Sequence, residues 1–428
     1  MKRNSLLALA GALLFAGAAI SQVVVVPQVT SIGSADLFQD VVNGVPQSPS
    51  YYAPASLLGN YSATLNGNNP ENALIGGDAT TNLFQRGTTG ASVTTTTTYG
   101  GPDRWAYWSG TSTAMTVSQD TTAADLPSGY KAAFKMARTS GQTGVVQVCM
   151  EQVVETVNSL QFAGQTAEVD FLLVTGSNFS GSGVTVWVSS GTGTDEGSAK
   201  LAFGINAGGG GGTGWTGQVN KSGTYTVAAS QGPVRVTFAA PVAAAATEVG
   251  VAICFTPTGT ASTNDYVALS GIQLTRNNAL TAAAGTAGVV LPANDGRAKA
   301  FARRSQALES VLQQRYYYQL TESATIWPIA PCAAIDTTHT NCFVPFPVTM
   351  RSAPALSFAN GFATPTSTTQ ATLGACTTLA AATTVASTVG SVTGILVNCT
   401  ATTIPAAGTA SFLYSNNSTG AIKASAEL

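Results

Sequence analysis

The chain has 428 residues and a formal net charge of −2, and only 9% of its residues are charged although 44% are hydrophobic. An ordinary globular protein is about 25% charged. This balance excludes a general basic field that would hold nucleic acid. The single histidine, His339, excludes a histidine-cluster metal site and leaves almost no room for a histidine-based nucleophilic triad. We therefore expect no metal, no cofactor and no nucleic-acid partner.

Residues 1–29 form an apolar segment that includes the two basic residues Lys2 and Arg3 near its start. The apolar run over 6–20 is typical of a secretory signal peptide. It is too short for a comfortable transmembrane helix, so no membrane span is predicted. The alternative is a retained anchor that buries its apolar side chains in a partner protein. The candidate anchor residues are Leu6, Leu13, Phe15 and Val24.

Two β regions follow this segment. Residues 30–72 mix small polar turns with aromatic residues, and Asn43-Gly44 is a strong hairpin signal, so we expect a small β attachment module. Residues 73–281 contain many short strand-like pieces, one of them at 202–206, with Gly, Thr and Ser turns between them. Val184, Val186 and Val188 alternate with polar or aromatic residues, as in a half-buried strand. This pattern favours an antiparallel jelly-roll sandwich.

Residues 282–318 are predicted to be a linker and one helix, which we place over 296–318 because apolar residues recur there near helical spacing. Residues 319–428 return to alternating strands and predict a second, smaller β-sandwich. The predicted fold is therefore mostly β, with a jelly roll, one helix and a second sandwich. The residues expected at a domain or oligomer interface are Phe301, Leu308, Val311, Leu312, Tyr316 and Tyr317.

The six cysteines contain no C-x-x-C pair, so a zinc ribbon or thioredoxin-like chemistry is not expected. The plausible local disulfide pairs are Cys332 with Cys342 and Cys376 with Cys399. Buried free thiols remain an equally open alternative, because the redox compartment is not known from the sequence.

Candidate catalytic carboxylates occur in two pairs. Glycan hydrolysis needs two carboxyl groups about 5–10 Å apart. In extended strands, Glu151 and Glu155 would lie about 13 Å apart, and Glu168 and Asp170 about 6.6 Å apart. The second pair lies in a strand that enters the core, so we expect a surface-facing pair and not an active site. The prediction is that the chain is not an enzyme.

Aromatic side chains are the better lead to a ligand. The apolar faces of a sugar ring stack on Trp and Tyr, while Asn, Asp and Gln bind its hydroxyl groups. The candidate glycan contacts are Trp105, Tyr107, Trp108 and Trp215. The alternative for these residues is a role as core or loop anchors.

Several short motifs occur in a specific order between residues 73 and 354. They are LIGGD at 74–78, NLFQRG at 82–87, DRW at 103–105, EQ at 151–152 with NSL at 158–160, AGQT at 163–166, GIQL at 271–274, QRYY at 314–317 and FPVTMRSAP at 346–354. Together they resemble a family of tailed-phage virion proteins with a carbohydrate-binding-module-like jelly roll and a small C-terminal β domain. Two positions depart from the family pattern, where Thr275 replaces an acid and Gln313 replaces a cysteine.

The resemblance implies a virion structural protein, such as a tail fibre, spike or head appendage, which is commonly a homotrimer. The expected partners are other virion proteins, bound through the N-terminal segment, and a glycan of the host surface. Two other functions remain open. One is a secreted or cell-surface bacterial carbohydrate-binding protein with a cleaved signal peptide, and the other is a glycan depolymerase.

Overall fold

The structure is a computed structural model and describes residues 72–79, 85–87, 91–93, 97–110, 115–205, 213–277, 280, 288–291, 298–321, 327–359, 361–367, 372–381, 390–415 and 421–428. Before residue 71 it describes only the backbone of six short strands. The chain divides into two units, Met1–Pro70 and Glu71–Leu428.

The first unit contains three antiparallel strand pairs. They are β1 (Ala8–Ala12) with β2 (Val23–Pro27), β3 (Leu37–Phe38) with β6 (Ala53–Pro54), and β4 (Val41–Val42) with β5 (Val45–Pro46). The last pair flanks the predicted hairpin signal at residues 43–44. Val24 lies in β2, whereas Leu6, Leu13 and Phe15 lie outside the described residues. Among the described residues, no helix is both long and apolar enough to span a bilayer.

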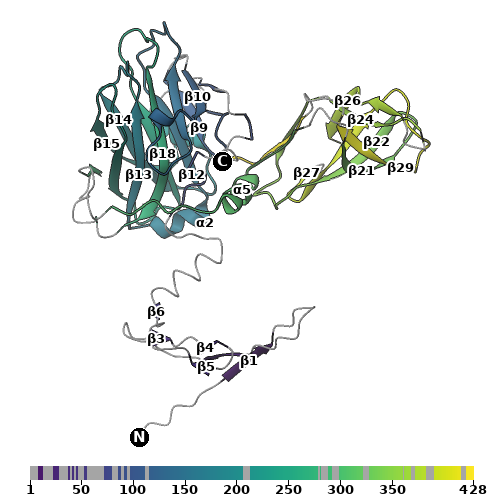
Figure 1. Cartoon of the computed structure of the whole chain (residues 1–428), viewed down its shortest axis with the longest axis horizontal. Helices are drawn as coiled ribbons and strands as arrows, with labels where there is room; N and C mark the ends of the chain where they lie inside the picture. The colour runs from purple at the N-terminus through teal and green to yellow at the C-terminus, as the bar shows by residue number, and fades with distance from the viewer. Residues whose placement is uncertain are drawn as a thin grey trace. The chain divides into compact units, whose positions relative to one another are not determined.

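The second unit begins with a sandwich of two antiparallel sheets (Figure 1). The seven-stranded sheet has the order β19 (Val289–Val290), β16 (Val234–Pro241), β13 (Thr166–Thr175), β18 (Tyr266–Arg276), β11 (Ala133–Arg138), β10 (Met115–Asp120) and β7 (Ala91–Ser92). The six-stranded sheet has the order β15 (Thr216–Thr226), β14 (Gly183–Thr192), β17 (Glu248–Phe255), β12 (Val148–Val154), β9 (Ala106–Ser109) and β8 (Thr98–Tyr99).

Alternating apolar residues form the core between these sheets. Val184, Val186 and Val188 of β14 are buried, as the period-two pattern predicts, and they join one cluster with Phe171 of β13 and Ile253 of β17. The prediction of a mostly β, antiparallel sandwich is confirmed.

Two secondary-structure predictions from the sequence, one of a helix and one of a strand, are wrong in detail. The helix expected over 296–318 is limited to α5 (Gln306–Gln314), which begins after Ser305, whose side chain accepts a hydrogen bond from Leu308 N. Residues 298–302, called the strap below, instead lie along the seven-stranded sheet. Lys299 N donates to Glu168 Oε1 at 2.8 Å, and Gln273 Nε2 donates to the Lys299 carbonyl at 3.1 Å. In a longer helix, these backbone groups would instead form hydrogen bonds within the helix.

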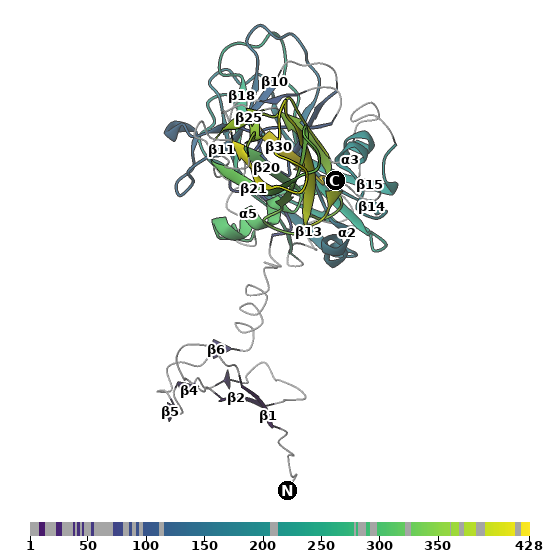
Figure 2. The same cartoon turned by 90° about the vertical axis from the view of Figure 1, so that its right-hand side faces the viewer.

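The segment expected as a strand at 202–206 forms part of α3 (Ser198–Ile205), which contacts β12, β14 and β15 and lies at the right in Figure 2. Leu201 and Ala202 bury the apolar side of this helix against the outer face of the six-stranded sheet. Among the described residues, the other short helices are α2 (Thr156–Ser159), η2 (Ala123–Asp125) and η3 (Leu160–Phe162).

The C-terminal lobe, from β20 to β30, is a second and smaller sandwich. Its three-stranded sheet has the order β20 (Tyr317–Thr321), β30 (Ala421–Ser425) and β23 (Ala355–Ala359). Its eight-stranded sheet has the order β25 (Leu373–Ala375), β24 (Phe362–Pro365), β29 (Ala410–Ser415), β21 (Pro328–Ala334), β22 (His339–Pro345), β28 (Gly394–Thr400) and β26 (Thr378–Ala381), and β27 (Gly390–Ser391) also pairs with β28. Val344 and Leu413 of the larger sheet pack in one cluster with Ile422 of the smaller one.

All six cysteines form disulfides in the structure. Cys332–Cys342 and Cys376–Cys399 are the two local pairs named from the sequence, with S–S distances of 1.98 and 2.03 Å. Cys149–Cys254, at 2.00 Å, was not named, because its cysteines are 105 residues apart in the sequence. They lie directly opposite each other on the neighbouring strands β12 and β17.

An ion-pair network joins the jelly roll to the C-terminal lobe. Glu427 Oε1 accepts from Arg86 Nη2 at 3.1 Å, and its Oε2 accepts from Arg104 Nη1 at 3.0 Å. Arg86 Nη1 also donates to Asp103 Oδ1 at 3.1 Å. The side chain of Arg104 is only 2% exposed and that of Glu427 only 5%. These four residues are called the junction cluster below.

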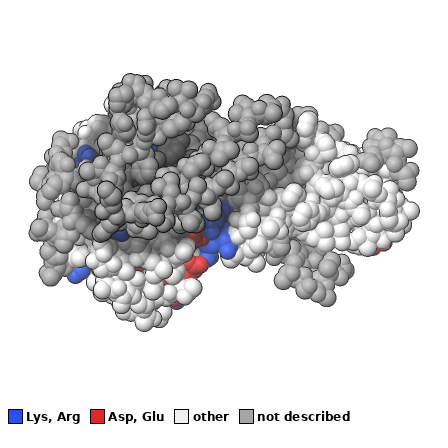
Figure 3. Space-filling model, turned by 90° about the horizontal axis from the view of Figure 1, so that it is seen from below, with Lys and Arg blue, Asp and Glu red and all other residues white. Residues whose placement is uncertain are grey.

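Two tyrosines complete this junction. The Arg104 guanidinium lies 3.7 Å from the ring centre of Tyr316, and that of Arg86 lies 3.5 Å from the ring centre of Tyr317. Further ion pairs cross between the jelly roll and the segments that follow it, namely Arg351 with Asp195 at 2.9 Å and Arg315 with Glu155 at 3.4 Å. On the face drawn in Figure 3, blue and red atoms meet near the middle, and most of the other described surface is white.

We expect Glu427→Gln to lower the free energy of unfolding by about 3–5 kcal/mol, because it leaves two buried guanidinium groups without their shared carboxylate. The matched control is Glu196→Gln, which breaks a partly exposed i,i+4 pair with Lys200 and should cost less than about 0.5 kcal/mol. Urea denaturation of both variants tests this expectation. Equal small losses would show that the junction cluster adds little to stability.

We expect the double variant Cys149→Ala/Cys254→Ala to lose more stability than Cys332→Ala/Cys342→Ala. The first disulfide joins residues 105 apart and the second joins residues 10 apart. Loop-closure entropy then gives losses of about 5 and about 3 kcal/mol. Denaturant midpoints of the two double variants check the order, and a reversed order would contradict it.

Candidate functional site

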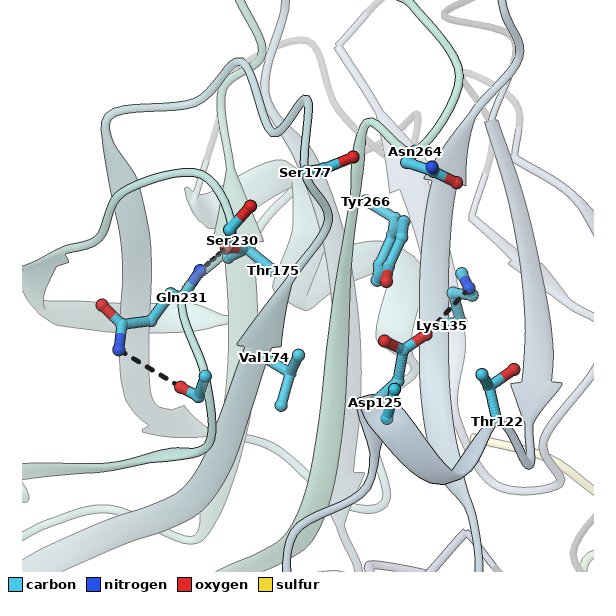
Figure 4. Close-up of a pocket in the computed structure, with 12 residues that line it drawn as sticks. Thr122, Asp125, Lys135, Val174, Thr175, Ser177, Ser230, Gln231, Asn264 and Tyr266 are labelled. Carbon is cyan, nitrogen blue, oxygen red and sulfur yellow. Dashed lines mark hydrogen bonds and ion pairs between the residues drawn. The ribbon is translucent and has the colours of Figure 1, made fainter.

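A polar pocket of about 480 Å³ opens near the ends of β13 and β18 (Figure 4). Four connecting segments meet there with the sheet: η2 after β10, the turn after β13, the connection between β15 and β16, and the connection between β17 and β18. The lining residues are Thr122, Ala124, Asp125, Lys135, Val174, Thr175, Ser177, Ser230, Gln231, Gly232, Asn264 and Tyr266. The seven-stranded sheet therefore supplies the base of the pocket, and the connecting segments supply its rim.

Tyr266 lies at the centre of the pocket, between the Thr175 side and the Lys135 side (Figure 4). Lys135 Nζ is 3.8 Å from the ring centre of Tyr266, which is a cation–π distance. Gly176 packs so closely on this ring that a Cβ at that position would lie 2.6 Å from two ring atoms and 2.0 Å from the Asn264 carbonyl oxygen. Only glycine allows the turn after β13 to approach Tyr266 in this way.

Two residues of the rim have left-handed backbone conformations. The φ angle is 56° at Ser230 and 67° at Asn264, and such angles are uncommon for residues other than glycine. Ser230 N donates to Gly176 O at 3.0 Å, and the Asn264 carbonyl accepts from Asn178 N at 3.3 Å. These hydrogen bonds hold the two strained turns against the end of β13. Strained residues that the surrounding structure holds in place are concentrated at functional sites.

One ammonium group and two carboxyl groups lie beside Tyr266. Lys135 Nζ is 2.8 Å from Asp120 Oδ2 and 3.4 Å from Asp125 Oδ2. Burial, followed by the neighbouring Asp125, raises the pKa of Tyr266 above its usual value, so the phenol keeps its proton at neutral pH. Burial by itself raises the pKa of Asp120, but hydrogen bonds from Lys135 and Thr122 outweigh it and leave that pKa below its usual value.

The arrangement suits a polyhydroxylated ligand. The lining includes a phenol, two side-chain amides (Gln231 and Asn264) and the hydroxyl groups of Ser177, Ser230 and Thr122. Its volume lies within the usual range of ligand pockets, about 300–1,000 Å³. Hydroxyl groups of a ligand both donate and accept hydrogen bonds, and so do these side chains.

The aromatic residues named from the sequence lie elsewhere. Trp105, Tyr107, Trp108 and Trp215 are 0%, 1%, 0% and 4% exposed, so none presents a ring face to a ligand at the surface. Trp105 Nε1 donates to Gly76 O at 3.2 Å inside the core. The expectation that these residues contact a glycan is therefore corrected. Strand β9 is covered on both of its faces, and Trp215 is buried in a separate cluster with Leu201 of α3.

The closer carboxylate pair holds the strap in place. Asp170 accepts from Arg235 Nε at 2.7 Å and from Thr237 Oγ1 at 2.9 Å. Glu168 accepts from Asn277 and from the backbone N–H of Lys299. Both carboxylates are buried, contrary to the expectation of a surface-facing pair. Among the described residues, no group of three or more His, Cys, Asp or Glu side chains could hold a metal ion.

The residues expected at an interface make contacts within this chain. Phe301 packs on Tyr130 of the jelly roll, with ring centres 5.9 Å apart. Leu312 packs against a small cluster that includes Tyr316, and Tyr317 stacks with Arg86. Leu308 is half-buried, whereas Val311 is 43% exposed.

Comparison with known proteins gives no family. No protein-family model matches the chain, and no curated protein matches it. Among solved structures, a tailspike protein 4 domain of bacteriophage CBA120 aligns with 9% identity and a TM-score of 0.29, over 48% of this chain and 21% of the other. An arabinose-bound α-L-arabinofuranosidase aligns with 11% identity and a TM-score of 0.27, over 49% and 28%. A protein of Bacteroides thetaiotaomicron that is described as sugar-binding aligns with 12% identity and a TM-score of 0.24, over 45% and 99%. TM-scores this low do not establish a common fold, and the chain spans about a fifth of the length of the tailspike domain.

Glu151 is a buried carboxyl group outside the polar pocket. It is 0% exposed on the outer face of the six-stranded sheet, where Trp108 Nε1 donates to its Oε2 at 3.0 Å. Its other oxygen has no hydrogen-bond partner in the structure. Burial raises the pKa of Glu151 well above its usual value, because an unpaired carboxylate is costly to hold away from water.

This raised pKa predicts how the free energy of unfolding changes with pH. The unfolded chain ionises Glu151 near pH 4.5 and the folded chain only at a higher pH, so stability is lost as the pH rises above 4.5. The loss amounts to about 1.4 kcal/mol per pH unit up to the folded pKa. We expect Glu151→Gln to be more stable than the parent chain at about pH 8 and to lose this advantage toward pH 4.5. Unfolding free energies measured across this range test it, and a pH-independent difference would contradict the assignment.

Proposed function

We propose that this chain is a non-enzymatic structural protein of a phage virion, a fibre or spike appendage whose jelly roll attaches to a glycan of the host surface. The observation that carries this proposal is the polar pocket, which Tyr266, Asn264 and Gln231 line together with several hydroxyl groups. Such a lining matches the hydroxyl groups and apolar faces of a saccharide.

The ordered motifs support an appendage protein because their residues have a common structural purpose. Arg86, Asp103 and Arg104 come from the QRG and DRW motifs, and Tyr316 and Tyr317 come from the QRYY motif. All five meet at the junction between the jelly roll and the C-terminal lobe. The motifs that resemble the phage family therefore contain the residues that hold the two lobes together. A protein that displays a binding surface requires such a rigid junction.

The disulfides and the low charge support a location outside the reducing cytosol. Three disulfides close the two lobes, and such bonds persist in oxidising compartments and on virion surfaces. We propose the virion as the location and the N-terminal segment as the site that binds other virion proteins. A homotrimer would present three pockets, so that weak glycan contacts add up through avidity.

The secreted or cell-surface carbohydrate-binding protein remains the second candidate, since the run over 6–20 is typical of a signal peptide. N-terminal sequencing of the mature protein separates the two. A start near Gln22 favours the secreted protein, and a retained segment favours the virion anchor. The depolymerase is less favoured, because Glu168 and Asp170 are already bound by the strap and by Arg235.

We expect the full chain to bind a subset of host-surface glycans on an array and to release no shorter products from them. Asn264→Gly keeps the left-handed backbone and removes the amide, and Gln231→Ala removes the second amide. Each should weaken binding of the selected glycan about 5–10-fold, the effect of losing about one hydrogen bond.

The matched control is Gln161→Ala, a glutamine outside the pocket whose side chain bonds to Asn158 O. It should leave the affinity unchanged in isothermal titration. Equal affinities for all three variants would place the glycan elsewhere on the protein, and cleavage of the glycan would favour the depolymerase.

A further inference from the structure

A second pocket, of about 420 Å³, lies where the jelly roll meets the three-stranded sheet of the C-terminal lobe. We call it the cationic pocket. Its lining residues are Arg86, Tyr99, Gly100, Tyr317, Ala355, Ser357, Lys423 and Ser425. They include two cationic side chains and no carboxylate.

Arg86 is held rigidly at one wall of this pocket. Its guanidinium bonds to Asp103 and Glu427 and lies 3.5 Å from the ring centre of Tyr317. It also lies 5.6 Å from the ring centre of Tyr99. Since the side chain is only 11% exposed, it keeps this position without the freedom of a surface arginine.

Lys423 supplies the second charge from β30. It lies opposite Gln319 on β20 and opposite Ser357 on β23, in the middle of the three-stranded sheet. Ser425 is on the same face of β30, two residues further on. In the described part of the chain, no ion pair joins Lys423 to an Asp or Glu within 4.0 Å. Its charge is therefore available to a ligand.

The two cationic side chains of the pocket differ in their partners. Arg86 is paired with Asp103 and Glu427, whereas Lys423 has no carboxylate partner among the described residues. An ammonium group beside serine hydroxyl groups is a common way to bind a carboxylate or another small oxyanion.

We propose that the cationic pocket binds the carboxylate of an acidic saccharide, of the uronic acid type, with Lys423 as its ion partner and Ser357 and Ser425 as hydrogen-bond partners. The choice of a saccharide rests on the proposed glycan attachment, while the choice of an anion rests on the pocket itself. The polar pocket and the cationic pocket would then bind different parts of one acidic polysaccharide.

The test titrates the full chain with glucuronic acid, with glucose and with inorganic phosphate, and follows binding by NMR. We expect glucuronic acid to bind, more weakly as salt is added, and glucose not to bind at the cationic pocket. Lys423→Gln should weaken glucuronic acid about tenfold. Ser357→Asp should have at least the same effect, since it places a carboxylate opposite an intact Lys423. Lys131→Gln, an exposed lysine that lines neither pocket, is the matched control and should change nothing.

Each remaining outcome decides the proposal. Binding of glucuronic acid that is unaffected by Lys423→Gln and Ser357→Asp overturns it. If phosphate binds as tightly as glucuronic acid and competes with it, the proposal of a saccharide ligand is overturned. The cationic pocket is then a site for free anions. If no glycan binds on the array but glucuronic acid still binds through Lys423, host attachment fails while the cationic pocket stands.

Discussion

The carboxylate of Glu427 bridges two guanidinium groups that the fold removes from water. A buried ion costs several kcal/mol unless it is paired, so Arg86 and Arg104 require this partner and Asp103 to remain where they lie. Their positions in turn determine where Tyr316 and Tyr317 stack and where β20 starts. These ion pairs hold the two β-sandwiches together along with Arg351–Asp195 and Arg315–Glu155, and they position the Arg86 wall of the cationic pocket.

The strands could be predicted because each carries its own pattern, as Val184, Val186 and Val188 do, and the mostly β sandwich followed from it. The strap could not be predicted, because residues 298–302 leave the helix to bond with Glu168 and Gln273, and these partners are distant in sequence. Cys149–Cys254 was missed for the same reason. The α3 error was avoidable, since Leu201, Ala202 and Ile205 already have helical spacing.

The candidate site shows a different limit of sequence reasoning. Aromatic residues in β9 suggested a surface platform, but helix α3 and the core cover that strand from both sides, and alternation alone cannot reveal such a cover. The polar pocket instead forms where four connections meet around Tyr266. Its nearest sequence signal is Asn264, a residue type that tolerates a left-handed turn, two positions before this tyrosine. The need for glycine at position 176 is visible only in the structure, where Tyr266 and the Asn264 carbonyl leave no room for a Cβ atom.

The order of the three-stranded sheet has a consequence for how the chain is made. β30 lies between β20 and β23, so both of those strands must wait for residues 421–425 before either has a partner in that sheet. During synthesis on a ribosome, the jelly roll can therefore close well before the C-terminal lobe does. Until Glu427 has left the exit tunnel, the nascent chain carries arginines without this carboxylate partner and two unpaired strand edges. During this interval, a chaperone or a second copy of the chain can associate with it most readily.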